Sequence, residues 1–401
     1  MDDIRQYHVP AHVPPELVHD KFDNFNTPGD FEAPQFGIAR KLHHDAPPIF
    51  WNPTQGGYWV VTRAADILEI CRDWQHFSSD PQFNYRRKHF PTRNLPAFYD
   101  PPEHTSARAI FAPVFSPGAV QSMEDDIRAF AGRLIEQYLP QGGCEFVHDI
   151  AQTFPVTIFL KLADAPLDRR EPMVEMANRY TRGDLQTTIG GQRDLANEIR
   201  GLVQSRMKNP GTDIISRITQ GTMMGRNLTE EEILGSTVFV FMAGLDTVAS
   251  MMSFIQLYLA RHPEKYQELR DDPTRIRGAV EELMRISGVV TMERGVCEEV
   301  TYKGVTFKPH DRVLLLLQVS GMDEAEVENP ETVDFSRDVS KHLVFGAGIH
   351  RCLGSHLARI EIRVFLEEWI KRVPSFHVAA EGRLATLGGT VWCPDKLPLA
   401  W

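Results

Sequence analysis

One cysteine stands in a loop whose neighbours could prepare it to bind a metal. The stretch HLVFGAGIHRCLGSHLARIE covers residues 342–361 and contains Cys352. A helix is expected over residues 353–372, so Cys352 lies just before a helix start, where free N–H groups and the helix dipole favour a thiolate. Gly348 and Gly354 have no side chain, so a flat ligand could approach the backbone closely. With neither a second cysteine nor a catalytic base nearby in the sequence, this pattern suits one axial ligand of a haem iron.

Two other interpretations compete for the same loop. A dinucleotide-binding loop would need the pattern GxGxxG, but GAGIHR places Arg351 where the third glycine belongs. A buried structural cysteine in a turn is the alternative for any single cysteine. Phe345 offers an aromatic wall beside the sulfur. The loop by itself leaves the ligand and the structural cysteine equally open.

A second group of polar residues interrupts a long apolar run, residues 236–260. Within it, Gly244 would let the expected helix pass close to a flat cofactor. The Thr247 hydroxyl could bond the carbonyl one turn back and open a groove, and the Asp246 carboxylate could relay protons from water. A helix-bending threonine and a satisfied aspartate are the bland alternative. The run is long enough to span a bilayer, but Asp246 at its centre would cost roughly 2.5–3.5 kcal/mol there. A buried central helix is therefore the better prediction.

Two pairs of charged or polar residues have helical spacing. Glu282 and Arg285 stand three apart, where a charge pair forms readily, and a solvated pair is the default interpretation. His104 and Arg108 stand four apart, one helical turn, and both can donate hydrogen bonds to a carboxylate.

Composition limits the classes of protein that the chain could be. It has 401 residues, 42% of them hydrophobic and 24% charged, which is ordinary globular composition. The formal net charge of −11 argues against non-specific binding to nucleic acid or anionic membranes. The five cysteines are scattered with no CxxC pair, so a disulfide framework is not expected and a reducing cytoplasm is the default. No apolar segment of signal-peptide length opens the chain.

Hydrophobic periodicity predicts a mostly helical protein with minor β structure. The helices are expected at residues 124–139, 149–163, 192–207, 229–263, 273–287 and 353–372, with Thr229 as an N-cap. Short strands are expected at residues 57–63, 300–307 and 312–320. No repeat or flexible linker divides the chain, so we expect one domain over residues 1–401.

Through these motifs the sequence resembles the cytochrome P-450 family, the haem-thiolate monooxygenases. Residues 345–354 fit that family's FxxGx(H/R)xCxG loop, residues 243–247 its (A/G)Gx(D/E)T motif, and residues 282–285 its ExxR motif. The resemblance extends over most of the chain and is closest to the soluble bacterial camphor-hydroxylase group. Shared stretches are AHVPPELV at 11–18, HFSS at 76–79, DPPE at 100–103, PGTD at 210–213, GLDTV at 244–248, VDFSR at 333–337 and LGSHLAR at 353–359.

The resemblance implies a mainly α fold with small β-sheets, in which haem b is buried between the long central helix and the cysteine-loop helix. It implies that Cys352 is the axial thiolate and that Asp246 and Thr247 deliver protons. Other residues implied to touch the haem are Phe345, Gly348, Gly354, Ala243 and Gly244, with His104, Arg108, Arg294 and His350 as donors to its propionates. Glu282, Arg285 and Arg337 are implied to form a buried structural triad.

The same resemblance implies a substrate, a partner and rival functions. The implied pocket wall comprises Phe83, Thr92, Phe239, Val240, Met242, Ala243, Val289 and Val290. Thr92 stands where the camphor enzyme has its ketone-binding tyrosine, and Met292 where it has an aspartate. The expected substrate is a monocyclic terpenoid or norisoprenoid ketone, and acceptance of camphor itself is left open. Electrons would come from an NADH-dependent flavin reductase through a [2Fe–2S] ferredoxin docked near Arg108, Arg351 and Arg359. A peroxide-driven peroxygenase and a non-enzymatic haem carrier or gas sensor are the alternatives.

Overall fold

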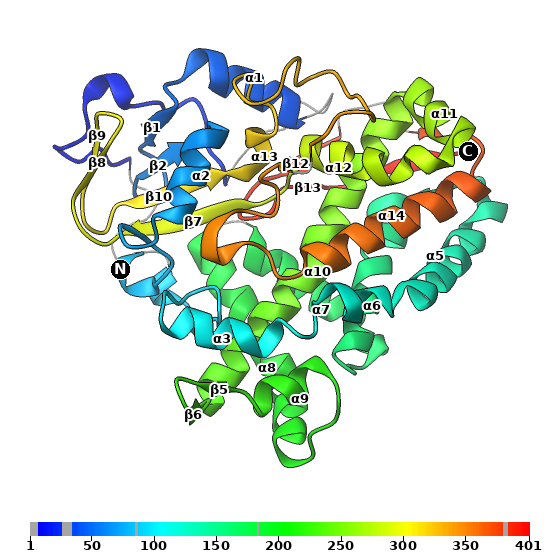
Figure 1. The fold of residues 1–401 in the computed structure, drawn as a ribbon, viewed down its shortest axis with the longest axis horizontal. Helices are drawn as coiled ribbons and strands as arrows, with labels where there is room; N and C mark the ends of the chain where they lie inside the picture. The colour runs from blue at the N-terminus through cyan, green and yellow to red at the C-terminus, as the bar shows by residue number, and fades with distance from the viewer. Residues whose placement is uncertain (1–6, 26–33, 85–86, 183, 340, 380–383) are drawn as a thin grey trace.

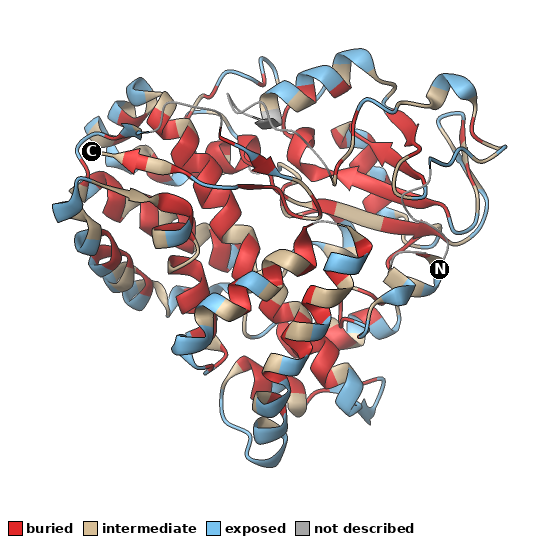
Figure 2. Ribbon diagram, turned by 180° about the vertical axis from the view of Figure 1, so that it is seen from behind, coloured by how far each residue is buried: buried red, intermediate tan, exposed pale blue. Residues whose placement is uncertain are grey.

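A long helix, α10 (Glu230–Arg261), runs through the middle of the molecule (Figure 1). The computed structural model describes residues 7–25, 34–84, 87–182, 184–339, 341–379 and 384–401. Buried residues fill the centre, and exposed residues line the outward faces of the surrounding helices (Figure 2).

The remaining helices pack around α10 or cover the sheet. They are α1 (Pro34–Asp45), α2 (Ala64–Arg72), α3 (Glu103–Phe111), α4 (Pro117–Gln121), α5 (Glu124–Tyr138), α6 (Phe154–Leu162), α7 (Arg170–Thr181), α8 (Leu185–Lys208), α9 (Ile214–Thr219), α11 (Pro263–Asp271), α12 (Ile276–Ile286), α13 (Leu317–Ser320) and α14 (Ser355–Arg372).

The strands form one main sheet and several small ones. They are β1 (Ile49–Asn52), β2 (Tyr58–Val61), β3 (Phe77–Ser78), β4 (Gly143–Glu145), β5 (Thr222–Met223), β6 (Arg226–Asn227), β7 (Thr291–Val296), β8 (Val300–Tyr302), β9 (Val305–Phe307), β10 (Arg312–Leu316), β11 (His377–Val378), β12 (Thr386–Leu387), β13 (Cys393–Pro394) and β14 (Pro398–Ala400). The main sheet has the order β1-β2-β10-β7-β3, parallel only between β2 and β10. Strands β11, β14 and β4 form a second sheet.

Helix α10 begins with a capping box. The Thr229 hydroxyl accepts from the Glu232 N–H at 3.2 Å, and the Glu232 carboxylate accepts from the Thr229 N–H at 2.8 Å. By length and composition this helix could cross a membrane, but 67% of its most apolar 18-residue window is buried inside the protein. The residues before and after its middle belong to different clusters of the core, one shared with α6–α9 and the other with α5, α12 and α14. The polar middle of α10 therefore lies where two cores meet.

Most of the expected helices are present, with shifted ends. The helix expected over 149–163 starts later, as α6, because a π-helical turn at Val147–Ala151 precedes it. The helix expected over 192–207 starts earlier, as α8, capped by the Asp184 side chain. The strand expected over 312–320 ends at Leu316, where the chain turns into α13, so that part of the prediction is wrong.

A buried charge cluster joins α12 to the segment that leads to the cysteine loop. Arg285 donates twice to Glu282, Nε to Oε2 and Nη2 to Oε1, both at 2.8 Å, and neither side chain is more than 1% exposed. Arg337 brings its Nε within 3.4 Å of Glu282 Oε1. Arg285 also donates to the carbonyl of Gly321 at 2.6 Å. The structure thus brings together the three residues expected to form a structural triad.

Removing the carboxylate of this cluster should destabilise the protein strongly. Glu282→Ala leaves the buried Arg285 without its counter-ion, which typically costs about 3–5 kcal/mol. The midpoint of urea unfolding, followed by far-ultraviolet circular dichroism, measures the loss. Glu331→Ala is the control, because Glu331 and its partner Arg40 are 47% and 58% exposed and such surface pairs contribute about 0–1 kcal/mol. Equal midpoints for the two variants would contradict a structural role for Glu282.

Candidate functional site

The cysteine loop is held by backbone hydrogen bonds across its base. The Cys352 N–H donates to the carbonyl of Phe345 at 2.9 Å, and the Gly346 N–H donates to that of Leu343 at 2.7 Å. Gly348 has a φ of +65°, and a Cβ placed there would lie 2.3 Å from the Cys71 carbonyl oxygen at the end of α2. Gly348 is therefore required for packing of the loop on α2, in addition to any ligand contact.

The Cys352 side chain is exposed towards a cavity, and protein surrounds the thiol on its other sides. Desolvation by these surroundings raises the pKa of the thiol, although the Gly354 N–H and the charges of Arg108, Arg351 and Arg359 lower it in part. A metal cation bound at the thiol would displace the proton, because the positive charge of the cation stabilises the thiolate. The geometry of this loop fits a single thiolate ligand.

The cavity has a volume of about 380 Å³ and lies between α10 and the cysteine loop with α14. From α10 it is lined by Ala243, Gly244 and Thr247. From the loop and α14 it is lined by Phe345, Cys352, Leu353, Gly354, Leu357, Ala358 and Glu361. A flat group placed here would have the thiol on one side and the threonine of α10 on the other.

Polar side chains at one edge of the cavity have unmet hydrogen-bonding capacity. Among the described residues, neither ring nitrogen of His104 nor Nη2 of Arg294 has a hydrogen-bond partner. Nε2 of His350 makes no hydrogen bond either, but it lies 3.6 Å from Asp100 Oδ1, within ion-pair distance. The two imidazole rings lie 4.4 Å apart, centre to centre. Arg108 also lines the cavity, and its Nη2 donates to the Arg351 carbonyl at 2.5 Å.

These groups fit the two propionates of a haem. Burial lowers the pKa of His104 to about 4 and that of His350 to about 3, so both rings are neutral at pH 7 and each can donate one N–H. A buried donor left without an acceptor costs about 1–3 kcal/mol, so several of them around one cavity edge indicate that carboxylates belong there. Arg294, Arg108 and the two histidines are the residues that could hold them.

The acid and the alcohol of α10 have different surroundings. Thr247 lines the cavity, and its Oγ1 donates to the Ala243 carbonyl at 2.9 Å. Asp246 is not among the cavity-lining residues. Its carboxylate accepts from Thr181 Oγ1 at 2.7 Å, from Ser250 Oγ at 3.1 Å, and from Arg182 in a buried ion pair. Sequence reasoning missed Thr181 and Arg182, because nothing near α7 in sequence links them to Asp246.

Gly244 serves a different contact from the one expected. A Cβ at this position would lie 2.4 Å from the ring of Phe159 on α6. The absence of a side chain therefore allows α10 to pack closely on α6. Gly244 also lines the cavity, so the expected approach of a cofactor remains compatible with this packing.

Six of the eight residues expected in the pocket wall line the cavity: Phe239, Val240, Met242, Ala243, Val289 and Val290. Phe83 and Thr92 do not, so the structure places these two elsewhere. Phe83 stacks on the ring of His310, with 6.1 Å between the ring centres. The Thr92 hydroxyl donates to Asn94 Oδ1 at 3.2 Å, inside a polar cluster completed by Gln192. An alignment without gaps mispredicts these two positions, because the backbone of this loop turns their side chains towards other parts of the protein.

The cavity also has walls that sequence reasoning did not identify. They include Arg87, Phe90, Phe98, Tyr180 and Glu361. Glu361 is fully buried on α14, and this burial raises the pKa of its carboxyl well above the usual range. Its position nine residues after Cys352, on the helix that follows the cysteine loop, was the available signal.

The expected basic docking patch is smaller than the sequence indicated. Arg359 donates to both carboxylate oxygens of Glu281, Nε at 2.6 Å and Nη2 at 3.0 Å, and its guanidinium lies 4.5 Å from the centre of the Phe345 ring. Its charge is therefore compensated. Arg351 is exposed beside the loop and keeps its charge at the surface.

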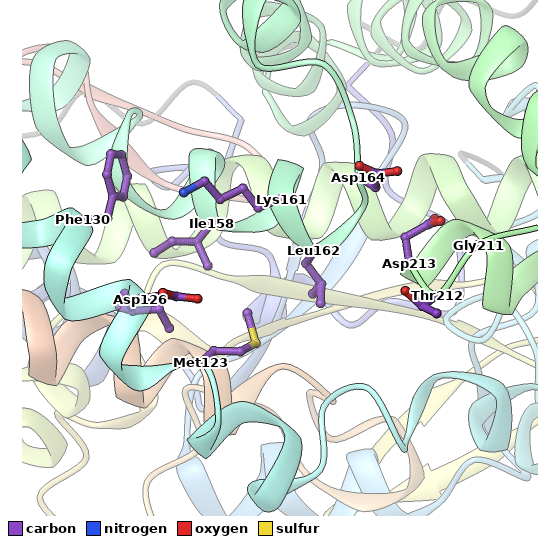
Figure 3. A pocket seen from close by; sticks show the side chains of 11 residues that line it. Met123, Asp126, Phe130, Ile158, Lys161, Leu162, Asp164, Gly211, Thr212 and Asp213 are labelled. Atoms are coloured by element: carbon purple, nitrogen blue, oxygen red, sulfur yellow. The ribbon is translucent and has the colours of Figure 1, made fainter.

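A second cavity, about 630 Å³, lies between α5, α6 and the loop before α9 (Figure 3). Phe130 and Lys161 stand at one end of it, and Asp164 and Asp213 at the other. The Arg206 guanidinium donates hydrogen bonds to both of those carboxylates. This second cavity is lined by neither the Cys352 thiol nor the donors that lack partners. The chemistry indicated by the sequence lies at the first cavity.

Comparison with known proteins gives the family of this chain. The family model for cytochrome P450 matches residues 178–373. A probable cytochrome P450 127A1 from Sinorhizobium fredii is 33% identical over the full length of both chains. The chain belongs to the cytochrome P-450 family.

Solved structures of this P-450 family give the same result for the fold. The crystal structure of CYP101C1 is 34% identical and has a TM-score of 0.88, covering 98% of this chain and all of that one. That of CYP101J2 is 31% identical with a TM-score of 0.85, covering 98% and 99%. The protein is thus a haem-thiolate monooxygenase of this family, with haem b as its prosthetic group and a need for dioxygen and a redox partner.

The assignment of Cys352 as the iron ligand has a direct spectroscopic test. The carbon-monoxide complex of the reduced wild-type protein should show the strongly red-shifted Soret band of a thiolate-bound haem. Cys352→Ser should abolish that band, since a hydroxyl is a far weaker electron donor than a thiolate. The same substitution at Cys144, in strand β4, is the control and should leave the band unchanged. A red-shifted band that survived in Cys352→Ser would contradict the assignment.

Proposed function

We propose that this P-450 hydroxylates a small apolar, terpenoid or norisoprenoid-like molecule. It would use dioxygen and two electrons from an NADH-dependent flavin reductase, delivered by a [2Fe–2S] ferredoxin. One observation supports this most directly. The Cys352 thiol and the Thr247 hydroxyl line a single cavity whose other walls are largely apolar. When bound, the haem supplies activation of dioxygen, while the protein supplies binding, orientation and protons.

The lining supports a substrate recognised by shape. Val240, Met242, Val289 and Val290 present aliphatic or thioether surface, and Phe239 adds an aromatic ring. Such walls exclude water from the space beside Thr247 and fix the orientation of an apolar skeleton. A bound haem would share this cavity, so the space that remains beside Thr247 favours a compact, rigid ring system.

Thr247 and Asp246 are proposed to divide the handling of protons. Because the proton of Thr247 Oγ1 points to the Ala243 carbonyl, its lone pairs can accept a hydrogen bond from a group inside the cavity. Asp246 stands next to it but behind the wall, held by Thr181, Ser250 and Arg182. We infer that Asp246 passes protons from the α7 side towards the cavity, while Thr247 keeps the receiving group in position.

The docking of the electron donor is proposed to use the surface beside the cysteine loop. Arg351 is the exposed cation there, and Arg108 lies next to it through the hydrogen bond to its carbonyl. An acidic ferredoxin would be attracted to this patch despite the net negative charge of the protein, and salt would weaken the attraction.

Reversing the charge of Arg351 tests this docking surface. Arg351→Glu should slow electron transfer from a ferredoxin several-fold at low ionic strength and flatten its dependence on salt, because it removes the attraction that steers the encounter. Stopped-flow reduction rates at increasing salt measure the effect. Arg359→Gln is the control, since Glu281 already compensates that charge, and it should change the rate far less. Unchanged rates in Arg351→Glu would place the docking surface elsewhere.

Separate substitutions at Thr247 and Asp246 test the proposed division of roles. Thr247→Ala should still bind substrate and consume NADH, but should divert most of the flux to hydrogen peroxide. Asp246→Asn should slow turnover, by roughly 10²–10⁴-fold if a positioned proton donor is lost, with nearly unchanged substrate affinity. The measurement is NADH consumed, peroxide released and product formed, with one substrate.

The control for Thr247→Ala is Thr237→Ala on the same helix. Thr237 Oγ1 makes the same kind of hydrogen bond, to the Ile233 carbonyl at 2.8 Å, but it does not line the cavity. It should keep wild-type coupling of NADH to product. Wild-type coupling and rate in both Thr247→Ala and Asp246→Asn would mean that the pair only shapes the helix. Product formed with peroxide alone, at the rate seen with NADH and both partners, would favour a peroxygenase instead.

A further inference from the structure

A buried arginine lines the same cavity and has no role so far. Arg87 belongs to the 3-10 turn Arg87–His89, in the loop before α3. Its side chain is only 13% exposed, and its guanidinium carbon lies 4.6 Å from the centre of the Phe98 ring. Burying a cation against an aromatic face recovers part of its lost hydration but not all of it.

The protein partners of Arg87 are weak. Its Nη1 donates to the Ser79 carbonyl at 3.3 Å, and its Nε lies 3.8 Å from Glu293 Oε2, beyond hydrogen-bond distance. Glu293 is bound more closely by a second buried arginine, because Arg312 Nε donates to Oε1 at 2.8 Å. The described part of the chain offers Arg87 no further acceptor. Burial lowers its pKa to about 10, with Glu293 offsetting only part of that effect.

The surroundings of Arg87 belong to the side of the cavity walled by α7 and α10. Phe98 packs in the core cluster that contains Val240 of α10. Phe90 packs against Phe98 and against Tyr180 of α7, with ring centres 5.9 Å and 5.8 Å apart. The Tyr180 hydroxyl accepts from Asn94 Nδ2 and Gln192 Nε2, so its own proton remains free to donate to an acceptor that approaches Arg87.

We propose that Arg87 binds a carboxylate carried by the substrate, which makes the substrate class apolar acids of terpenoid size. The inference rests on the proposed function. It keeps the terpenoid-sized skeleton of the expected substrate but replaces its ketone with a carboxylate. A carboxylate matches the planar fork of a guanidinium and can take two parallel hydrogen bonds, whereas a ketone offers one acceptor and no charge. The other charged groups that face Arg87 are Glu293, Arg294 and Arg312, and two of these three are also cations.

A pair of ligands that differ only in charge tests this proposal in the ferric holoenzyme. The probes are 4-tert-butylcyclohexanecarboxylate and 4-tert-butylcyclohexyl methyl ketone, which have nearly the same shape. Binding is measured from the optical spin shift at pH 7.5. Wild-type protein should bind the acid at least about tenfold more tightly than the ketone, because a charge-assisted pair in a desolvated site is stronger than one neutral bond. Arg87→Met should remove that preference and keep the affinity for the ketone, and Arg87→Lys should keep part of it.

The same loop provides a matched control. Arg93 also lies over an aromatic ring, that of Tyr99 at 3.7 Å, but it is paired with Asp80 at 2.5 Å and does not line the cavity. Arg93→Met should leave the acid-to-ketone ratio unchanged.

An acid-to-ketone ratio in Arg87→Met equal to that of the wild type would overturn the proposal. If this variant also lost haem faster to apomyoglobin, Arg87 would be a partner of a haem propionate instead. Neither titration uses electrons or dioxygen. A failure of the proposed hydroxylation would therefore not affect the binding result, and a failure of carboxylate binding would not affect the test of hydroxylation.

Discussion

The thiol of Cys352 has to face a cavity while the backbone around it stays packed, and much of the fold serves that requirement. The loop that carries it turns back on itself through the bond from Cys352 to Phe345 and packs on α2 at Gly348, where a side chain would collide with Cys71. Behind it, the Glu282–Arg285 pair ties α12 to Gly321, and Arg337 joins the pair from the segment that leads to the loop. A ligand position of this kind is stiff because its supports come from several distant parts of the chain.

Helix α10 passes through two apolar core clusters, so each polar side chain on it needs a hydrogen-bond partner there. Thr237, Thr247 and Ser253 each donate to the carbonyl four residues earlier, so these hydroxyls satisfy their own protons within the helix. Asp246 cannot do so, since a carboxylate needs donors, and these come from α7 through Thr181 and Arg182. The position of α7 is therefore coupled to the helix that carries the proposed proton-handling residues.

The sequence located the features that depend on short-range spacing. The capping box at Thr229, the Glu282–Arg285 pair and the loop around Cys352 are each contained within a few residues, and the structure places their members together. It did not locate contacts that depend on how distant segments meet. Arg182 on Asp246 and Glu281 on Arg359 are such contacts, and only the three-dimensional packing of α7 and α12 reveals them.

The loop before α3 shows a different kind of failure. Phe83 and Thr92 were expected in the pocket because a relative has pocket residues at the same sequence distance. A loop without regular periodicity can change which of its residues face inward when its turns change. In this loop, the cavity is lined instead by Arg87, Phe90 and Phe98. Helical positions such as Phe239 and Met242 kept their expected orientation, because the helix period fixes which side chains share a face.

Two arginines with little exposure, Arg182 and Arg87, differ in whether the protein itself supplies a close counter-charge. Burial lowers the pKa of Arg182, but the interactions with Asp246 and Cys393 together outweigh it, so the pKa is raised above its ordinary value. Thr181 and Ser250 complete the bonding of the Asp246 carboxylate, so Arg182 has a close counter-charge inside the protein, although its Nε has no hydrogen-bond partner among the described residues. Arg87 has the opposite balance, because Glu293 is held more closely by Arg312 and burial dominates. A buried cation whose counter-charge is incomplete in the protein stabilises an anion that enters beside it, and the cavity is the space from which such an anion can come.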